Sequence, residues 1–267
     1  MPGQVIALLT DFGEDDFFTA SLKGVILETN PSARIVDISH RVPPFDIRAA
    51  GFILSACAPF FPFRTVFLTV VDPGVGSSRR ILAAECEGRF YVAPDNGVLS
   101  RVLAAGEAVR VHSVMEEKYF LPGGSKTFEG RDKMAPVAAR LVGALSVGDL
   151  GPEIRDWTRI PDSRPEASGG TIRGQVLYVD RFGNCITDIP AGLLETQVEK
   201  LGSKSISLTL RGRKVRDFLP CYDVQEKGQP LFLVGSLGLV EVAVCRGSAA
   251  QLFGARPGDE VSMEFDR

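Results

Sequence analysis

The stretch VIALLTDFG at residues 5–13 decides the fold class, because an unbroken apolar run that ends in a polar, glycine-bearing loop is typical of a strand buried on both faces. A helical pattern follows at residues 15–30, and a second strand and helix are predicted at 33–38 and 46–58. Residues 65–71 predict another apolar strand. This alternation indicates an α/β domain with a mainly parallel sheet, whose functional loops lie at the carboxyl ends of the strands.

The pattern of the sequence changes in its second half. A stretch rich in Pro, Ser and Gly is followed by strand-like segments with no long helix between them. We therefore predict an α/β domain over residues 1–157, a linker over residues 158–170 and a smaller, mostly antiparallel β domain over residues 171–267.

The composition argues against several classes of protein. The 267-residue chain carries 30 Lys and Arg against 33 Asp and Glu, so it lacks the basic excess that a nucleic-acid partner usually requires. Its five cysteines include no Cys-x-x-Cys pair, which argues against a disulfide framework and a zinc knuckle. The most apolar stretch, residues 51–63, is too short to span a bilayer and contains prolines, and no signal peptide is apparent. We expect a cytoplasmic protein without nucleic-acid or membrane partners.

Aspartates follow the predicted strands repeatedly, each in a short string that contains glycine. One aspartate in a strand-end turn is usually a turn former, but four in similar positions point to a site. Glycine in each string lets the backbone approach a ligand closely. The strings are TDFG at 10–13, DPGVG at 72–76, PDNG at 94–97 and DRFGN at 180–184.

Three more strings follow the same order along the chain: TFEGRD at 127–132, GSLG at 235–238 and RGSAA at 246–250. Taken together, the seven strings resemble the S-adenosyl-L-methionine (SAM) hydrolase family, which forms adenosine and is related to fluorinases and chlorinases. The resemblance covers essentially the whole chain. It implies hydrolysis of SAM to adenosine and L-methionine, with SAM as substrate and no cofactor. It also implies an N-terminal α/β domain, a C-terminal β domain, and a homotrimer with the ligand held between domains of neighbouring subunits.

The same resemblance implies which residues bind the adenosine part of SAM. Asp11 would hold the ribose hydroxyls, a role that suits a bidentate carboxylate acceptor. Asn184 has an amide donor and an acceptor that fit the edge of adenine, and backbone groups of Ser248 and Ala249 would complete that edge.

Further substrate-binding residues are implied around the rest of the ligand. Phe45 and Phe182 would form apolar or stacking walls, and Asn96 lies in one of the matching strings. Asp180 would pair with the ammonium group of the methionine part, and Ser236 would donate to its carboxylate. Core packing for Phe45 and a turn role for Ser236 are the alternatives that the residues themselves leave open.

The resemblance implies that Asp72, Arg79 and the residue at position 129 hold the attacking water. The family usually has histidine in the third position, whereas this chain has Glu129. Two carboxylates near one water should raise the proton affinity of at least one, unless Arg79 is near enough to compensate. We therefore name Asp72, Arg79 and Glu129 as candidate catalytic residues, and expect a rate that changes between roughly pH 5 and 8.

Three other functions are considered. Glu129 makes a non-catalytic or weakly active SAM-binding protein conceivable. A SAM-dependent halogenase is disfavoured, because the carboxylate of Asp72 should repel a halide and fluorinase-like members have serine where this chain has Gly130. A divalent-metal hydrolase would use clustered carboxylates, but neither histidine of the chain lies in a ligand-spaced motif, so we expect no metal site. The metal ligands of such a hydrolase would be Asp11, Asp72, Asp95 and Asp132.

Overall fold

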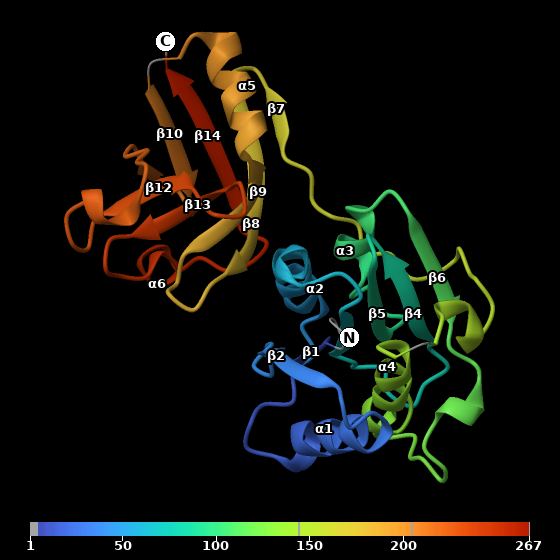
Figure 1. Ribbon diagram of the computed structural model, residues 1–267. Coiled ribbons are helices and arrows are strands. Elements are labelled where there is room, and N and C mark those ends of the chain that lie inside the picture. Colours follow the sequence, from blue (N-terminus) through green and yellow to red (C-terminus); the bar gives the residue numbers. More distant parts are fainter. Residues whose placement is uncertain (1–4, 144, 204, 267) are drawn as a thin grey trace. The chain divides into compact units, whose positions relative to one another are not determined.

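The computed structural model describes residues 5–143, 145–203 and 205–266, and the chain divides between Pro161 and Asp162 into two units (Figure 1). Each unit has its own hydrophobic core. Within the described residues, no helix is long and apolar enough to cross a membrane.

The sheet of the N-terminal unit has the order β2-β1-β3-β5-β4-β6 and is mixed, not mainly parallel as we predicted. The first three pairs are parallel, whereas β4 runs antiparallel to both of its neighbours. A two-residue turn of Glu87 and Gly88, both with positive φ, joins β4 directly to β5 and therefore forces these strands to be antiparallel. The strands are β1 Val5–Thr10, β2 Arg34–Ser39, β3 Val66–Val70, β4 Ile81–Cys86, β5 Arg89–Pro94 and β6 Val109–Ser113.

Helices cover both faces of this sheet, which explains why its central strands are apolar throughout. Alternate residues of β1 and β3, including Ile6 and Leu68, share one core with α1 and α4, while α2 packs against α3 and against β1. The side chain of Asp46 caps α2 by accepting from the amide of Ala49 at 2.9 Å. The main helices are α1 Phe17–Thr29, α2 Ile47–Cys57, α3 Ser100–Ala104 and α4 Ala135–Leu141, and short 3-10 turns lie at Ala58–Phe60, Glu117–Tyr119 and Val147–Leu150.

The helical segment after Glu129 begins with a π-helical turn, η3 Gly130–Met134, which continues into α4. Single π turns inside helices often lie at functional sites. Here the turn directly follows Glu129.

The carboxyl ends of β1, β3 and β5 lie at one edge of the sheet, because these three strands are parallel neighbours. Asp11 follows β1, Asp72 lies two residues beyond β3, and Asn96 lies two residues beyond β5. Loops that are far apart in the sequence therefore meet at the same edge.

The C-terminal unit is an antiparallel sheet with the strand order β11-β10-β14-β8-β9-β13-β12, in which β7 also pairs with β8. Its core includes Phe232, Val261 and Met263, all fully buried. The sequence did not predict α5, an 11-residue helix between β9 and β10 that buries Leu194. The elements are β7 Glu166–Ser168, β8 Thr171–Val179, β9 Cys185–Pro190, α5 Ala191–Leu201, β10 Ser205–Leu210, β11 Arg213–Val215, the 3-10 turn η5 Tyr222–Val224, β12 Pro230–Val234, β13 Leu239–Val244, α6 Ala249–Phe253 and β14 Glu260–Asp266.

The segment predicted as a linker, residues 158–170, is bonded to structured parts at both ends. The amide of Thr158 donates to Asp95 at 2.7 Å, and the amide of Ile160 donates to the hydroxyl of Ser100 at 2.8 Å. Further along, β7 pairs with β8 of the C-terminal unit.

Candidate active site

The loop between β3 and β4 carries Asp72 and Arg79, whose side chains form a bidentate ion pair. The Nε of Arg79 donates to both carboxylate oxygens of Asp72, at 3.0 and 2.9 Å, and its Nη2 donates to Oδ2. The amide of Gly74 also donates to Oδ1 of Asp72, at 3.2 Å. The side chains of Asp72 and Arg79 are only 5% and 10% exposed, so the pair is well shielded from water.

Glu129 joins this pair from the segment before η3. Its Oε2 accepts from Nη2 of Arg79 at 2.5 Å, and its Oε1 accepts from Nζ of Lys133 at 2.5 Å. The close approach of Gly76 to the carbonyl of Lys126 brings the two segments together, since a Cβ on Gly76 would lie 2.7 Å from that oxygen. We call Asp72, Arg79, Glu129 and Lys133 the Arg79 cluster.

The Arg79 cluster keeps Glu129 ionised. Burial by itself would raise the pKa of Glu129, but the hydrogen bonds and positive charges of Lys133 and Arg79 outweigh burial and lower it below its ordinary value. The positive charge of Arg79 is thus near enough to compensate for the repulsion between the carboxylates of Asp72 and Glu129. For Glu129, the direction of this pKa shift argues against titration between pH 5 and 8, and the expected pH dependence of the rate stays a prediction.

The neighbourhood of Gly130 bears on which nucleophile the site could take. Gly130 is buried, and a Cβ at this position would lie 2.9 Å from one methyl group of Val70 and 3.4 Å from the other. A serine would therefore require Val70 to move. The structure offers no ready space for the side chain that fluorinase-like members have here.

Asp132 and Asp95, which the metal-hydrolase alternative needs, hold local structure instead. Asp132 accepts from the amide of Ser125 at 2.7 Å and from Arg131, while Asp95 accepts from Nε of Arg80 at 2.8 Å. Across the described ranges, His, Cys, Asp and Glu side chains do not gather in any group of three that could hold a metal ion.

Asp11 holds the backbone of Phe45 at the end of β1. Its Oδ2 accepts from the amide of Phe45 at 2.9 Å, and Phe45 has a left-handed backbone with φ of 68°. The Phe45 side chain is 68% exposed, so the core-packing alternative for this residue is not what the structure shows. An exposed aromatic ring on a constrained backbone is available to a ligand.

Asn96 ties two strand ends together. Its Nδ2 donates to the carbonyl of Val71 at 2.8 Å, and its Oδ1 accepts from the amide of Val98 at 3.1 Å. Both polar atoms of the side chain are therefore engaged within the protein, and a role in substrate binding stays a prediction.

In the C-terminal unit, Asp180 organises the turn between β8 and β9. Its Oδ1 accepts from the amides of Phe182 and Asn184 at 2.9 and 2.8 Å, and its Oδ2 accepts from the side-chain amide of Asn184 at 2.9 Å. Asn184 is buried, whereas Phe182 is 77% exposed. Such an Asx-type turn fixes the positions of all three residues.

Gly183 connects this turn to the start of α6. A Cβ on Gly183 would overlap the side chain of Ser248, and the amide of Ala250 donates to the carbonyl of Gly183 at 2.8 Å. Ser248 caps α6 by accepting from the amide of Gln251 at 3.1 Å. The structure therefore brings Asn184, Ser248 and Ala249 to one place.

Ser236 is exposed in the turn between β12 and β13, beside a buried carboxylate that the sequence analysis did not consider. A Cβ on Gly235 would overlap the carboxylate of Glu241, and Glu241 accepts a hydrogen bond from the hydroxyl of Tyr222. Burial raises the pKa of Glu241, the Tyr222 hydrogen bond opposes this, and the charge of Asp180 raises it further. Asp180 is therefore near enough for its negative charge to act on the carboxyl group of Glu241.

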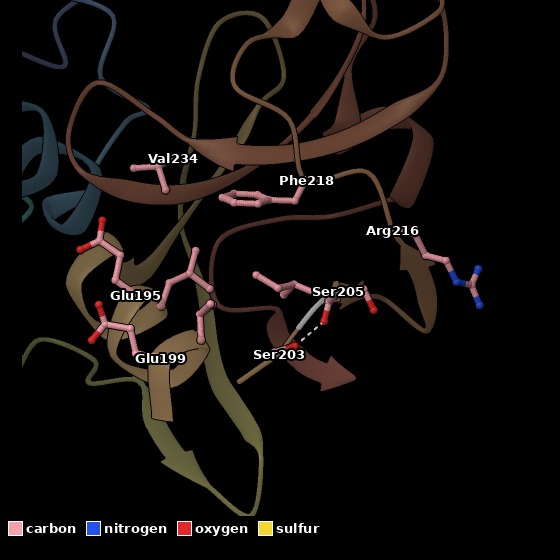
Figure 2. Close-up of a pocket in the computed structure, with 10 residues that line it drawn as sticks. Glu195, Glu199, Ser203, Ser205, Arg216, Phe218 and Val234 are labelled. Carbon is pink, nitrogen blue, oxygen red and sulfur yellow. Dashed lines mark hydrogen bonds between the residues drawn. The ribbon is translucent and has the colours of Figure 1, made fainter. Parts of the chain in front are cut away.

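A separate surface pocket of about 640 Å³ lies on the C-terminal unit, and none of the predicted site residues lines it (Figure 2). Phe218 and Val234 border it on one side, and Glu195 and Glu199 project from α5 on another, with Arg216 further along the rim. We do not assign this pocket to SAM.

Comparison with known proteins shows the family of the chain. The family model of the SAM hydroxide adenosyltransferase N-terminal domain matches residues 6–151, and that of the C-terminal domain matches residues 174–262. The chain belongs to the SAM hydroxide adenosyltransferase family.

Several SAM hydroxide adenosyltransferase relatives are similar over nearly their full length. The (R)-S-adenosyl-L-methionine hydrolase of Salinispora tropica is 38% identical over 267 residues, covering 98% of both chains. The hydrolase of the same name from Thermus thermophilus is 38% identical and covers 97% of this chain and 98% of its own. A fluorinase from an Actinoplanes species is more distant, at 26% identity with 97% of both chains covered. A crystal structure of an uncharacterized conserved protein from Thermotoga maritima has a TM-score of 0.90 at 32% identity, covering 98% of this chain and all of that one.

Two charged residues of the chain that contribute to these clusters were not predicted from the sequence. Lys133 lies four residues after Glu129, a spacing that pairs side chains on a helix but most often produces a solvent-exposed ion pair. Glu241 is the lone carboxylate in the apolar strand LVEVAV of β13, a pattern that could have identified it as a buried polar residue.

Proposed function

We propose that this protein hydrolyses SAM to adenosine and L-methionine by attack of water at the C5′ carbon. The observation that carries the proposal is the buried ion pair of Asp72 and Arg79, shared with Glu129, at the edge of the sheet where parallel strands end. Near-full-length similarity to proteins named (R)-SAM hydrolase supports it.

The chemistry needs little beyond a positioned nucleophile. The water oxygen forms a bond to C5′ while the C5′–S bond breaks, and its electron pair converts the sulfonium into the neutral thioether of methionine. The water proton passes to the carboxylate of Asp72 and then to solvent. Among the described residues, the hydrogen bonds of Arg79 use Nε and Nη2, which leaves Nη1 free to donate to the water oxygen.

We propose substrate contacts in line with the resemblance described above. Asp11 takes the ribose hydroxyls, Phe45 and Phe182 are walls, and Asn184 with the backbone of Ser248 and Ala249 takes the adenine edge. Asp180 binds the ammonium group of the methionine part, using the carboxylate lone pairs that its turn leaves unused. Ser236 donates to the carboxylate of the methionine part. Asn96 supports the site from the end of β5. The burial of Asn184 and the exposure of both rings fit these roles.

Incubation with SAM, followed by chromatography of the products, tests the proposal. We expect adenosine and methionine in equal amounts, no halogenated adenosine when chloride or fluoride is added, and the same rate with a chelator present. Unchanged SAM would indicate a binding protein, and activity that is lost with chelator and restored by a divalent ion would indicate the metal hydrolase.

We further propose, from the family resemblance, a cytoplasmic homotrimer in which SAM contacts residues of two subunits, without nucleic-acid or membrane partners. Light scattering at micromolar concentration tests the assembly. A monomer that binds SAM with full affinity would contradict it.

A further inference from the structure

Glu129 is a buried carboxylate whose two oxygens pair with two different cations. Its side chain is 6% exposed, its Oε2 accepts from Arg79 and its Oε1 accepts from Lys133, both at 2.5 Å. Among the described residues, these two are the charged groups that act on the carboxyl of Glu129, Arg79 from the loop after β3 and Lys133 from its own π-helical turn. Asp72 lies beyond Arg79.

The charges of the Arg79 cluster sum to zero only when Lys133 is included. Asp72 and Arg79 balance each other, so a neutral side chain at position 129 would need no further cation. Glu129 adds one negative charge to a buried site, and an unmatched buried charge is costly. Lys133 supplies the matching positive charge.

Within the described residues, the ion pair of Lys133 is with Glu129. Its Nζ lies over the ring of Phe120, 5.7 Å from the centroid, and its side chain is 33% exposed, so it approaches Glu129 from the outer side of the cluster. In the part of the chain that the structure describes, its side chain contacts Glu129 and Phe120, neither of which is a predicted substrate-binding residue. Any effect on catalysis therefore passes through Glu129 and Arg79.

We propose that Lys133 is a positioning residue: by neutralising Glu129, it leaves the guanidinium of Arg79 committed to Asp72. This rests on the proposed hydrolysis. Without Lys133, Glu129 has Arg79 as its one strong cation and competes with Asp72 for it, which moves the group that orients the water. Its affinity for a proton also rises, so protonation should disturb the cluster at a higher pH.

The experiment measures kcat and KM against pH for matched variants. We expect Lys133→Met to lower kcat roughly tenfold, with KM nearly unchanged, because small displacements of an oriented nucleophile are costly. The acidic limb of the kcat profile should move up by about one pH unit. Lys133→Arg, which keeps the charge, should restore most of the rate. Lys118→Met, which removes a surface lysine paired with Glu116, should change neither quantity.

A double-mutant cycle tests whether Lys133 acts through the charge of Glu129. In a Glu129→Gln background, Lys133→Met should cost little kcat. Melting temperatures of the four proteins between pH 4 and 7, measured without substrate, should show the same coupling. A Lys133→Met cost that is equal in both backgrounds, in kcat and in melting temperature, would overturn the role of Lys133 while leaving hydrolysis intact. Absence of hydrolysis in the wild-type protein would overturn the proposed function itself.

Discussion

At the scale of the residue, Arg79 decides the state of the Arg79 cluster, because it is shared by two buried carboxylates. Removing one partner of a buried ion pair commonly costs about 3–5 kcal/mol, since the other charge is left uncompensated. The sequence predicted Asp72, Arg79 and Glu129 as one set, and the structure brings them together. It did not predict Lys133, because spacing alone does not reveal that its partner is buried.

Asp72→Asn should lose most turnover while retaining SAM binding. The amide keeps the shape of the side chain but cannot accept the water proton, and the groups proposed to hold the two ends of SAM are elsewhere. We expect kcat to fall at least about a hundredfold, as for loss of a general base, with calorimetric affinity little changed. Asp223→Asn, at an exposed residue paired with Arg246, is the control. Normal turnover of Asp72→Asn would show that Asp72 is not at the water site.

Glu129→His should be tolerated best when Lys133 is neutral as well. A neutral imidazole leaves Asp72 and Arg79 balanced and makes Lys133 an unmatched cation. We expect Glu129→His combined with Lys133→Met to hydrolyse SAM at least as fast as the wild-type protein near neutral pH, and faster than Glu129→His alone. Turnover of the wild-type protein, of Glu129→His and of the double variant is measured at pH 7. A double variant slower than the wild-type protein, or slower than Glu129→His, would contradict the charge argument.

At the scale of the element, a tight turn and a weak apolar pattern explain the two features that the sequence did not predict, the mixed sheet and the helix α5. The apolar runs correctly indicated β1 and β3, but the sheet is mixed because Glu87 and Gly88 turn the chain back at once. The helix α5 was missed because its exposed face is polar and its short apolar stripe gives a weak pattern between strong strand signals. The glycine strings correctly located the strand-end loops, since close approach there leaves no room for a Cβ at Gly76 or Gly183.

The buried carboxylate of β13 should make stability depend on pH. Because the pKa of Glu241 is raised, its contribution to stability is fully present below the unfolded-state value near 4.5 and is lost as pH rises through the folded-state value. Glu241→Gln should therefore gain in free energy of unfolding, relative to the wild-type protein, between pH 4.5 and 7.5. Urea unfolding at both pH values measures this, with Glu260→Gln at an exposed position of β14 as control. A difference that is the same at both pH values would contradict it.

At the scale of the whole molecule, the two units have separate cores, and the predicted site residues are distributed over both. Composition and the change in sequence pattern were enough to predict an α/β part followed by an antiparallel β part. The resemblance implied that Asp72 and Glu129, 57 residues apart in the chain, share one site, whereas the fold was needed to show that Lys133 joins them. Arg79 bridges Asp72 and Glu129, and their two segments approach each other closely where Gly76 meets the carbonyl of Lys126.

The fragment of residues 162–267 should fold without the rest of the chain. Its core of Ile172, Phe232, Met263 and their neighbours is contained within the unit. We expect a cooperative urea transition and a β-type circular dichroism spectrum, but no SAM hydrolysis, since the fragment lacks Asp72 and Arg79. A fragment that remains unfolded would show that its stability depends on the N-terminal unit.

The π-helical turn at Gly130–Met134 has a consequence for how this chain can change over evolutionary time. Such a turn contains one residue more than an α-helical turn would need, so a single-codon deletion there could regularise the helix without disturbing the hydrogen bonds of α4. Because successive residues of an α-helix are rotated by about 100°, the deletion would swing position 129 away from Arg79. One deletion would therefore make the helix regular and, at the same time, break up the Arg79 cluster. Selection for hydrolysis therefore has to act against the deletion of a residue as well as against substitutions.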